Sequence, residues 1–184
     1  MFNEIAERYG EPHRHYHGLN HLVRLFETLE PVRGQLADPV RIDLTVWFHD
    51  IIYDPLRQDN EARSAEFAQK RLAAIGVGSD LTGRVAQLIR ATSEHREGGS
   101  DRDDALFLDA DFSILGAQRD TFDRYVADVR KEYRRVPKAE FDAARAKFLR
   151  AALAGDRVFL TTYFEQKYGD QARENMAREL AEIE

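Results

Sequence analysis

Residues 19–29 read LNHLVRLFETL, with apolar side chains at Leu19, Leu22, Val23, Phe26 and Leu29. Intervals of three and four residues bring such side chains to one face of an α-helix, whereas a half-buried strand would alternate at every second residue. The same helical spacing returns in residues 67–75. The sequence therefore predicts an all-α fold.

Capping residues divide the chain into further helices. Asp38 followed by Pro39 is typical of a helix start, and Gly76 and Gly78 are expected to end the helix that contains residues 64–75. The later expected helices cover residues 79–93, 106–114, 117–133, 137–154 and 170–183. Residues 159–164 are rich in β-branched and aromatic side chains, but an isolated strand has no partner, so we expect a helix or an irregular segment there.

The composition of the chain excludes some classes of site and partner. The chain has 184 residues, 27 Lys and Arg against 33 Asp and Glu, a net charge of −6 and no cysteine. This length without a linker-like stretch predicts one domain over residues 1–184. The absence of cysteine excludes thiolate chemistry and cysteine-based metal sites. The acidic balance argues against nucleic acid as a partner, and the lack of a long apolar run argues against a membrane, so we expect a cytoplasmic protein.

Histidine is concentrated near the N-terminus. Five of the six histidines come before residue 50, namely His13, His15, His17, His21 and His49. Imidazole is a frequent ligand for divalent transition metals, so clustered histidines beside carboxylates indicate a metal site. The alternative is a set of surface or helix-capping histidines.

The dipeptide His49-Asp50 lies in an apolar setting. It follows LTVWF and precedes IIY. Burying an ionised carboxylate and an imidazole among such residues costs free energy unless a cation or hydrogen bonds compensate. A bound divalent ion would supply that compensation.

Several sequence blocks carry a resemblance to a known family. His21 precedes the His49-Asp50 pair by 49 − 21 = 28 residues, and Asp111 follows in LDADF. A histidine on an early helix, a His-Asp pair and a distant aspartate make the chain resemble the HD-domain superfamily of metal-dependent phosphohydrolases. In more detail it resembles an uncharacterised branch of predicted phosphohydrolases through EPHRHYHGLNH, FHDIIYDP, DNEARSA, ATSEH, LDADFSILG, RKEYRRVP and ARENMAREL.

This resemblance implies an HD-type helical bundle and a four-residue metal site made of His21, His49, Asp50 and Asp111. Two nitrogen and two oxygen ligands suit one Mn²⁺, Fe²⁺, Co²⁺, Ni²⁺ or Zn²⁺ ion, with Mg²⁺ as a further candidate. Binuclear relatives carry two more histidines between the pair and the last aspartate, and here only His95 lies there, which favours one metal. Because residues two apart point about 200° apart on a helix, Asp109 is not expected to bind the ion that Asp111 binds. Asp109 is expected to contact a polar group, with the N-terminal segment as one candidate, or to lie at the rim.

Other polar residues are candidates for catalysis. In related HD enzymes an acidic residue shortly after the pair orients water or protonates the leaving oxygen, which favours Asp54 and then Glu61. The alternative for the segment that contains Asp59 and Asn60 is helix capping. His95 is a candidate for contacting the phosphate or the leaving group.

Further residues are candidates for binding the substrate. They are Arg14, His17, Asp59 and Arg130. Arg14 and Arg130 would supply countercharge to phosphate, although Arg130 also fits a solvated helix face. His17 has a backbone hydrogen bond as its alternative role.

The leading hypothesis is hydrolysis of a small phosphate ester, with a nucleotide as the expected substrate, by a metal-activated water. The alternative is a module of the same fold that binds a nucleotide or a metal without turnover.

Overall fold

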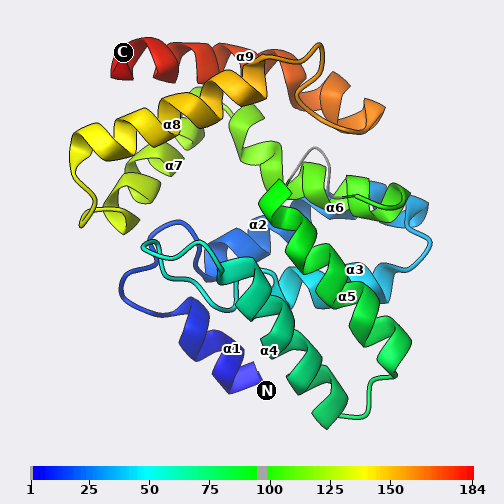
Figure 1. The fold of residues 1–184 in the computed structure, drawn as a ribbon. Helices are drawn as coiled ribbons and strands as arrows, with labels where there is room; N and C mark the ends of the chain where they lie inside the picture. The colour runs from blue at the N-terminus through cyan, green and yellow to red at the C-terminus, as the bar shows by residue number, and fades with distance from the viewer. Residues whose placement is uncertain (1, 95–98) are drawn as a thin grey trace. The chain divides into compact units, whose positions relative to one another are not determined.

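The computed structural model describes residues 2–94 and 99–184, and every regular element in these ranges is a helix. The all-α prediction is confirmed (Figure 1). The α-helices are α1 (Phe2–Tyr9), α2 (Leu19–Leu29), α3 (Pro39–Phe48), α4 (Asn60–Ala74), α5 (Ser79–Ala91), α6 (Arg102–Phe112), α7 (Arg119–Glu132), α8 (Lys138–Leu153) and α9 (Thr162–Ile183). The 3₁₀ helices are η1 (Glu30–Gln35), η2 (Thr92–Glu94) and η3 (Ser113–Gly116).

The contacts of the chain form two compact units, an N-terminal unit (Met1–Leu108) and a C-terminal unit (Asp109–Glu184). The division falls within α6, which is one continuous helix. The single domain expected over residues 1–184 stays a prediction. In the described ranges, no helix combines the length and the apolar composition that crossing a bilayer would require.

In the N-terminal unit, α4 and α5 run side by side, and α3 packs against both (Figure 1). The turn between α4 and α5 is closed by Gly76, whose φ of 82° lies in the left-handed region that favours glycine. The amide of Gly76 donates to the carbonyl of Ala73, and that of Val77 donates to the carbonyl of Leu72. This pair of bonds is a Schellman motif, so the helix end predicted at Gly76 is confirmed.

The start of α3 and the start of α6 are joined within this unit. Asp38 caps α3 by accepting from the amide of Arg41 at 3.0 Å, as its sequence position predicts. The buried Arg41 side chain donates to Asp104 at 2.7 Å, and Asp103 accepts from the amides of Ala37 and Asp38. These bonds fix the first turn of α6 against α3.

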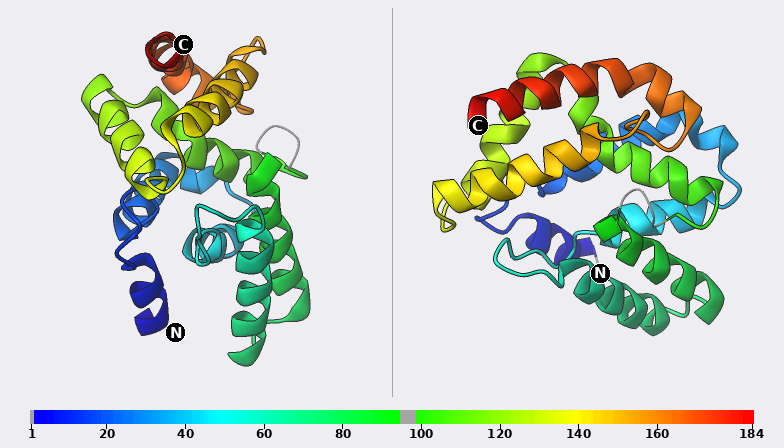
Figure 2. Two further views of the ribbon diagram at one scale, coloured as in Figure 1. Left: turned by 60° about the vertical axis from the view of Figure 1, so that its left-hand side comes forward. Right: turned by 45° about the horizontal axis from the view of Figure 1, so that its top comes forward.

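In the C-terminal unit, α9 packs against α8 and η3, and the views agree that α8 and α9 lie side by side (Figure 2). A Cβ on Gly116 would lie 2.5 Å from the carbonyl oxygen of Tyr168, so only glycine allows this approach of η3 to α9. The amide side chain of Asn175 donates to the carbonyls of Leu115 and Ala117, which holds the two elements together.

One helix begins earlier than expected. Residues 170–183 were expected to form the last helix, but α9 starts at Thr162. Thr161 caps it by accepting from the amide of Phe164, and Phe164 and Gly169 are buried within it. The ambiguous segment 159–164 therefore contains a helix start, because capping and burial outweigh the low helix propensity of its residues.

Candidate metal centre

His49 comes directly after the last residue of α3. Its amide donates to the carbonyl of Thr45 at 2.9 Å, so the helical turn continues to this residue. Its imidazole Nδ1 lies 3.0 Å from the carbonyl oxygen of Val46. A carbonyl only accepts, so Nδ1 carries the proton and the lone pair of Nε2 points away from α3. A histidine held in this way is oriented as metal-binding histidines usually are.

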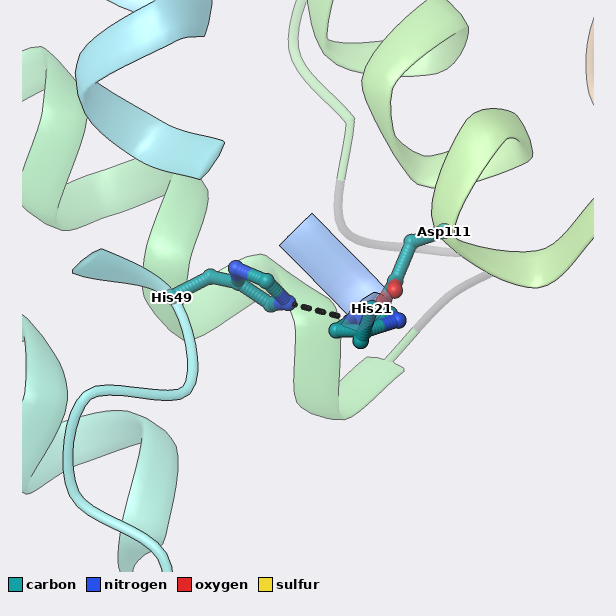
Figure 3. Close-up of side chains that lie close together, drawn as sticks. All are labelled: His21, His49 and Asp111. Atoms are coloured by element: carbon teal, nitrogen blue, oxygen red, sulfur yellow. Dashed lines mark hydrogen bonds between the residues drawn. The ribbon is translucent and has the colours of Figure 1, made fainter. Parts of the chain in front are cut away.

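His21 lies on α2, and its side chain meets that of His49. The two Nε2 atoms are 3.0 Å apart, as the dashed line in Figure 3 marks. Both residues are almost fully buried. Arg24 Nη2 lies 3.4 Å from His21 Nδ1, and because a guanidinium only donates, His21 Nδ1 accepts. The proton of neutral His21 is therefore on Nε2 and is donated to His49.

Asp50 completes this arrangement in the N-terminal unit. Its Oδ2 lies 3.3 Å from His49 Nε2 and 3.8 Å from His21 Nε2, and its side chain is 17% exposed. Three ligand atoms thus converge within the N-terminal unit.

The donor set fits a divalent ion. Two ligand atoms that each lie about 2.1 Å from an ion, at an angle of roughly 90°, are about 3.0 Å apart. The distance between the two histidine Nε2 atoms and the distance from His49 Nε2 to Asp50 Oδ2 are close to this value. A divalent cation would also offset the negative charge of the Asp50 carboxylate. The geometry explains how adjacent His49 and Asp50 both reach the centre, because they lie where the helix ends and the chain turns.

The electrostatics of Asp50 favour its ionised form. Burial alone would raise the pKa of this carboxyl, but the neighbouring His49, with His17 and His21, outweighs burial and holds that pKa below its usual range. Asp50 is therefore a carboxylate at neutral pH and is available as an oxygen ligand.

His17 lies beside the centre. Its ring stacks on Tyr53 with centroids 4.4 Å apart, and its centroid is 5.8 Å from that of His21. His13 Nε2 bonds to the carbonyl of Tyr53 at 3.0 Å. The N-terminal loop and the loop after Asp50 therefore form a layer of histidine and tyrosine rings next to the ligands.

Arg14 does not occupy the position expected of a phosphate clamp. Its side chain is fully buried, and it donates to the carbonyls of His17, Asp50 and Ile51 at 2.6 to 3.1 Å. It also donates to Glu11. These bonds direct the guanidinium to the backbone around the centre, so Arg14 positions the His-Asp loop. The sequence reveals the charge of Arg14 but not the carbonyls that surround it.

Asp54 and Asp59 also have structural partners. Asp54 is exposed, and its Oδ1 accepts from the amide of Leu56 at 3.0 Å. Asp59 stands at the N-cap position of α4 but makes no capping bond, because its carboxylate binds Arg57 at 2.6 Å. Asn60 instead bonds twice to the backbone of Asp54.

Glu61 has a perturbed carboxyl group in the first turn of α4. Burial raises the pKa of its carboxyl, and the charge of Asp50 raises it further. It lies in the first turn of α4, three residues before Ser64, whose hydroxyl bonds to both backbone groups of Ile52. Ser64 was not predicted as a site residue, although the DNEARSA block contains it.

The other expected residues lie elsewhere. His95 is outside the described residues. Arg130 belongs to the C-terminal unit, where it donates to the carbonyls of Tyr133 and Val136 and closes the turn after α7. This hydrogen bonding does not fit the expected phosphate contact.

The two aspartates of LDADF have different surroundings. Asp109 is fully buried and accepts from the amides of Leu160 and Thr161 and from the Thr161 hydroxyl. Its polar partner is therefore the segment before α9 and not the N-terminal segment suggested as one candidate. Burial raises the pKa of the Asp109 carboxyl despite these bonds. Asp111 lies in the last turn of α6.

Comparison of the chain with family models, with curated proteins and with solved structures gives no match.

Proposed function

We propose that the chain is a metal-dependent phosphohydrolase of the HD type that hydrolyses a small phosphate ester. The observation that carries the proposal is the convergence of His21, His49 and Asp50 in the N-terminal unit, where the Asp50 carboxylate lies 3.3 Å from His49 Nε2 and 3.8 Å from His21 Nε2. Such a group of acceptors is costly to bury without a cation.

The ligand set would be His21, His49, Asp50 and Asp111. His21, His49 and Asp111 offer two imidazole nitrogens and a carboxylate oxygen, a set that suits a divalent ion. Asp111 is included because the resemblance to the HD-domain superfamily implies a distant aspartate as the last ligand.

When bound, such an ion lowers the pKa of a coordinated water and offsets the negative charge on the phosphoryl oxygens. Hydrolysis forms a bond between phosphorus and the water oxygen and breaks the bond to the alcohol oxygen. We assign to Glu61 the donation of a proton to that leaving oxygen. Its raised pKa keeps a larger fraction of this carboxyl protonated than an exposed glutamate would have.

His17 would face the phosphoryl group. It lies among the rings beside His21, and a protonated His17 would lower the pKa values of the Asp50 and Glu61 carboxyls. A cationic His17 would complement a phosphate dianion, which is the role that the buried Arg14 does not fill.

The decisive experiment combines metal analysis with turnover. Purified protein is assayed for bound Mn, Fe, Co, Ni and Zn, and then for release of phosphate from a panel of phosphorylated metabolites, nucleotides included, with each ion and with Mg²⁺. We expect about one ion per chain and turnover that His49→Ala abolishes. His15→Ala is the matched control, because His15 is exposed.

Each result has a separate meaning. Metal binding without turnover of any ester would favour the binding module over the enzyme. Absence of metal, together with equal behaviour of the two variants, would contradict the centre itself.

A further inference from the structure

A cavity of about 440 Å³ lies in the N-terminal unit between the start of α4 and the end of α5. Its lining includes Gln58, Asp59, Glu61, Gln87 and Arg90. The two helices are antiparallel neighbours, so the first turn of α4 meets the last turns of α5.

Glu61 links the cavity to the segment that follows Asp50. It lines the cavity, and three residues later on α4 the hydroxyl of Ser64 bonds to both backbone groups of Ile52, which is two residues after Asp50. The first turn of α4 therefore packs against the loop after Asp50. If Glu61 donates its proton to the leaving oxygen, as proposed above, the alcohol part of the ester lies beside this cavity.

The charges of the cavity lining are balanced. Asp59 is paired with Arg57, and the guanidinium of Arg90 lines the same cavity as the Glu61 carboxyl. Arg90 is held along α5 by bonds to the carbonyl of Ala86 and to Gln69. A neutral group suits this lining better than a chain of further phosphates does.

The remaining lining is made of amides and small side chains. Gln58 and Gln87 each offer a donor and an acceptor, which is the pairing that alcohol hydroxyls require. The other lining residues are Ala62, Ala91 and Ser93, and none of the cavity's described lining residues is aromatic. The described lining therefore offers amides to the alcohol part and no aromatic ring on which a base could stack.

We propose that this cavity receives the alcohol part of the ester and that this part is a neutral, hydroxyl-rich group such as a sugar or a polyol, held by Gln58, Gln87 and Arg90. The inference rests on the proposed function, and it replaces the expected nucleotide with a sugar or polyol monophosphate as the substrate class.

The test compares esters that differ in their alcohol part. Wild-type protein and Gln87→Leu are assayed with glycerol phosphate, a hexose phosphate, a nucleoside monophosphate and phenyl phosphate. Leucine is a good helix former, so an exposed position of α5 should accept it. Gln35→Leu is the control, because Gln35 is exposed in the same unit and does not line the cavity.

We expect Gln87→Leu to raise KM for the hexose phosphate about tenfold, as the loss of a hydrogen bond allows, with kcat and metal content unchanged. KM for phenyl phosphate should stay within about twofold, since a phenyl group has no hydroxyls to bind. A wild-type preference for the nucleoside monophosphate or phenyl phosphate would overturn the inference. An equal effect of Gln87→Leu on all esters would also overturn it.

A binding measurement separates this inference from the proposed function. If no ester is hydrolysed, the proposed function fails, and the cavity is then tested by thermal unfolding with glycerol phosphate. Stabilisation of the wild type and of Gln35→Leu but not of Gln87→Leu would support the cavity. An equal shift of the melting temperature on adding glycerol phosphate in all three proteins would contradict it.

Discussion

Replacing Arg14 with methionine tests whether this residue positions the His-Asp loop or clamps phosphate. Methionine keeps most of the length and the packing against Tyr9 and Tyr53, over whose rings the guanidinium lies at 5.1 and 5.4 Å. It removes every donor. The carbonyls of His17, Asp50 and Ile51 then lose their partner.

The expected cost follows from those three bonds. Each buried acceptor left without a donor costs about 1 to 3 kcal/mol, and the bond to Glu11 is left out because that carboxylate is partly exposed. The lower end of this range gives a loss of about 3 kcal/mol for the three carbonyls. In a chain of this size the melting temperature would fall by roughly 6 to 12 °C.

Urea unfolding followed by circular dichroism measures this loss, and metal analysis measures its effect on the centre. We expect reduced stability and reduced metal content, because the Asp50 backbone is no longer held. Arg63→Met is the matched control, since Arg63 is exposed on α4. If Arg14→Met keeps its stability and its metal but loses affinity for phosphate, the clamp is correct and our reasoning is refuted.

Four further predictions concern the carboxylates and the ion. Asp111→Ala should strip the metal and abolish turnover. Asp109→Ala should keep the ion and lose about 2 kcal/mol of stability, because its bonds to the segment before α9 are removed. If metal analysis finds the ion in Asp111→Ala and not in Asp109→Ala, the two roles are exchanged. Glu61→Gln should lower kcat by roughly 10² to 10⁴ with metal retained, while Asp54→Asn should change it less than about twofold, because an amide oxygen can still accept from Leu56. If Glu61 is the proton donor, wild-type kcat falls as pH rises through its raised pKa, and a profile that rises there would disprove the assignment. Removing metal with a chelator should lower the melting temperature, and Mn²⁺ should restore it; an unchanged melting curve would argue against the ion.

Much of the local structure was predictable because it depends on neighbours in the sequence. The spacing in residues 19–29 predicts α2, and the Asp38-Pro39 pair predicts the start of α3. The start of α9 at Thr162 was missed. Helix propensity at its aromatic residues is weak, and the burial of Phe164 that offsets it arises only in the folded unit.

The site was predictable in its residue types but not in its contacts. The apolar setting of His49 and Asp50 indicates that they are buried, and the structure bears this out for His49. Nothing in the spacing indicates that Arg14 turns toward backbone carbonyls or that Asp54 bonds to its own loop. Such partners come from other segments or from the path of a turn.

The sequence by itself determined the all-α fold and most helix boundaries, because periodicity, caps and glycine act over three or four residues. Only the tertiary structure decided that the Nε2 atoms of His21 and His49 lie 3.0 Å apart across 28 residues of chain. It also decided which charged side chains remain available to a ligand. Packing between α2 and α3 sets those distances, and the bonds that a buried charge needs are found only where distant segments meet.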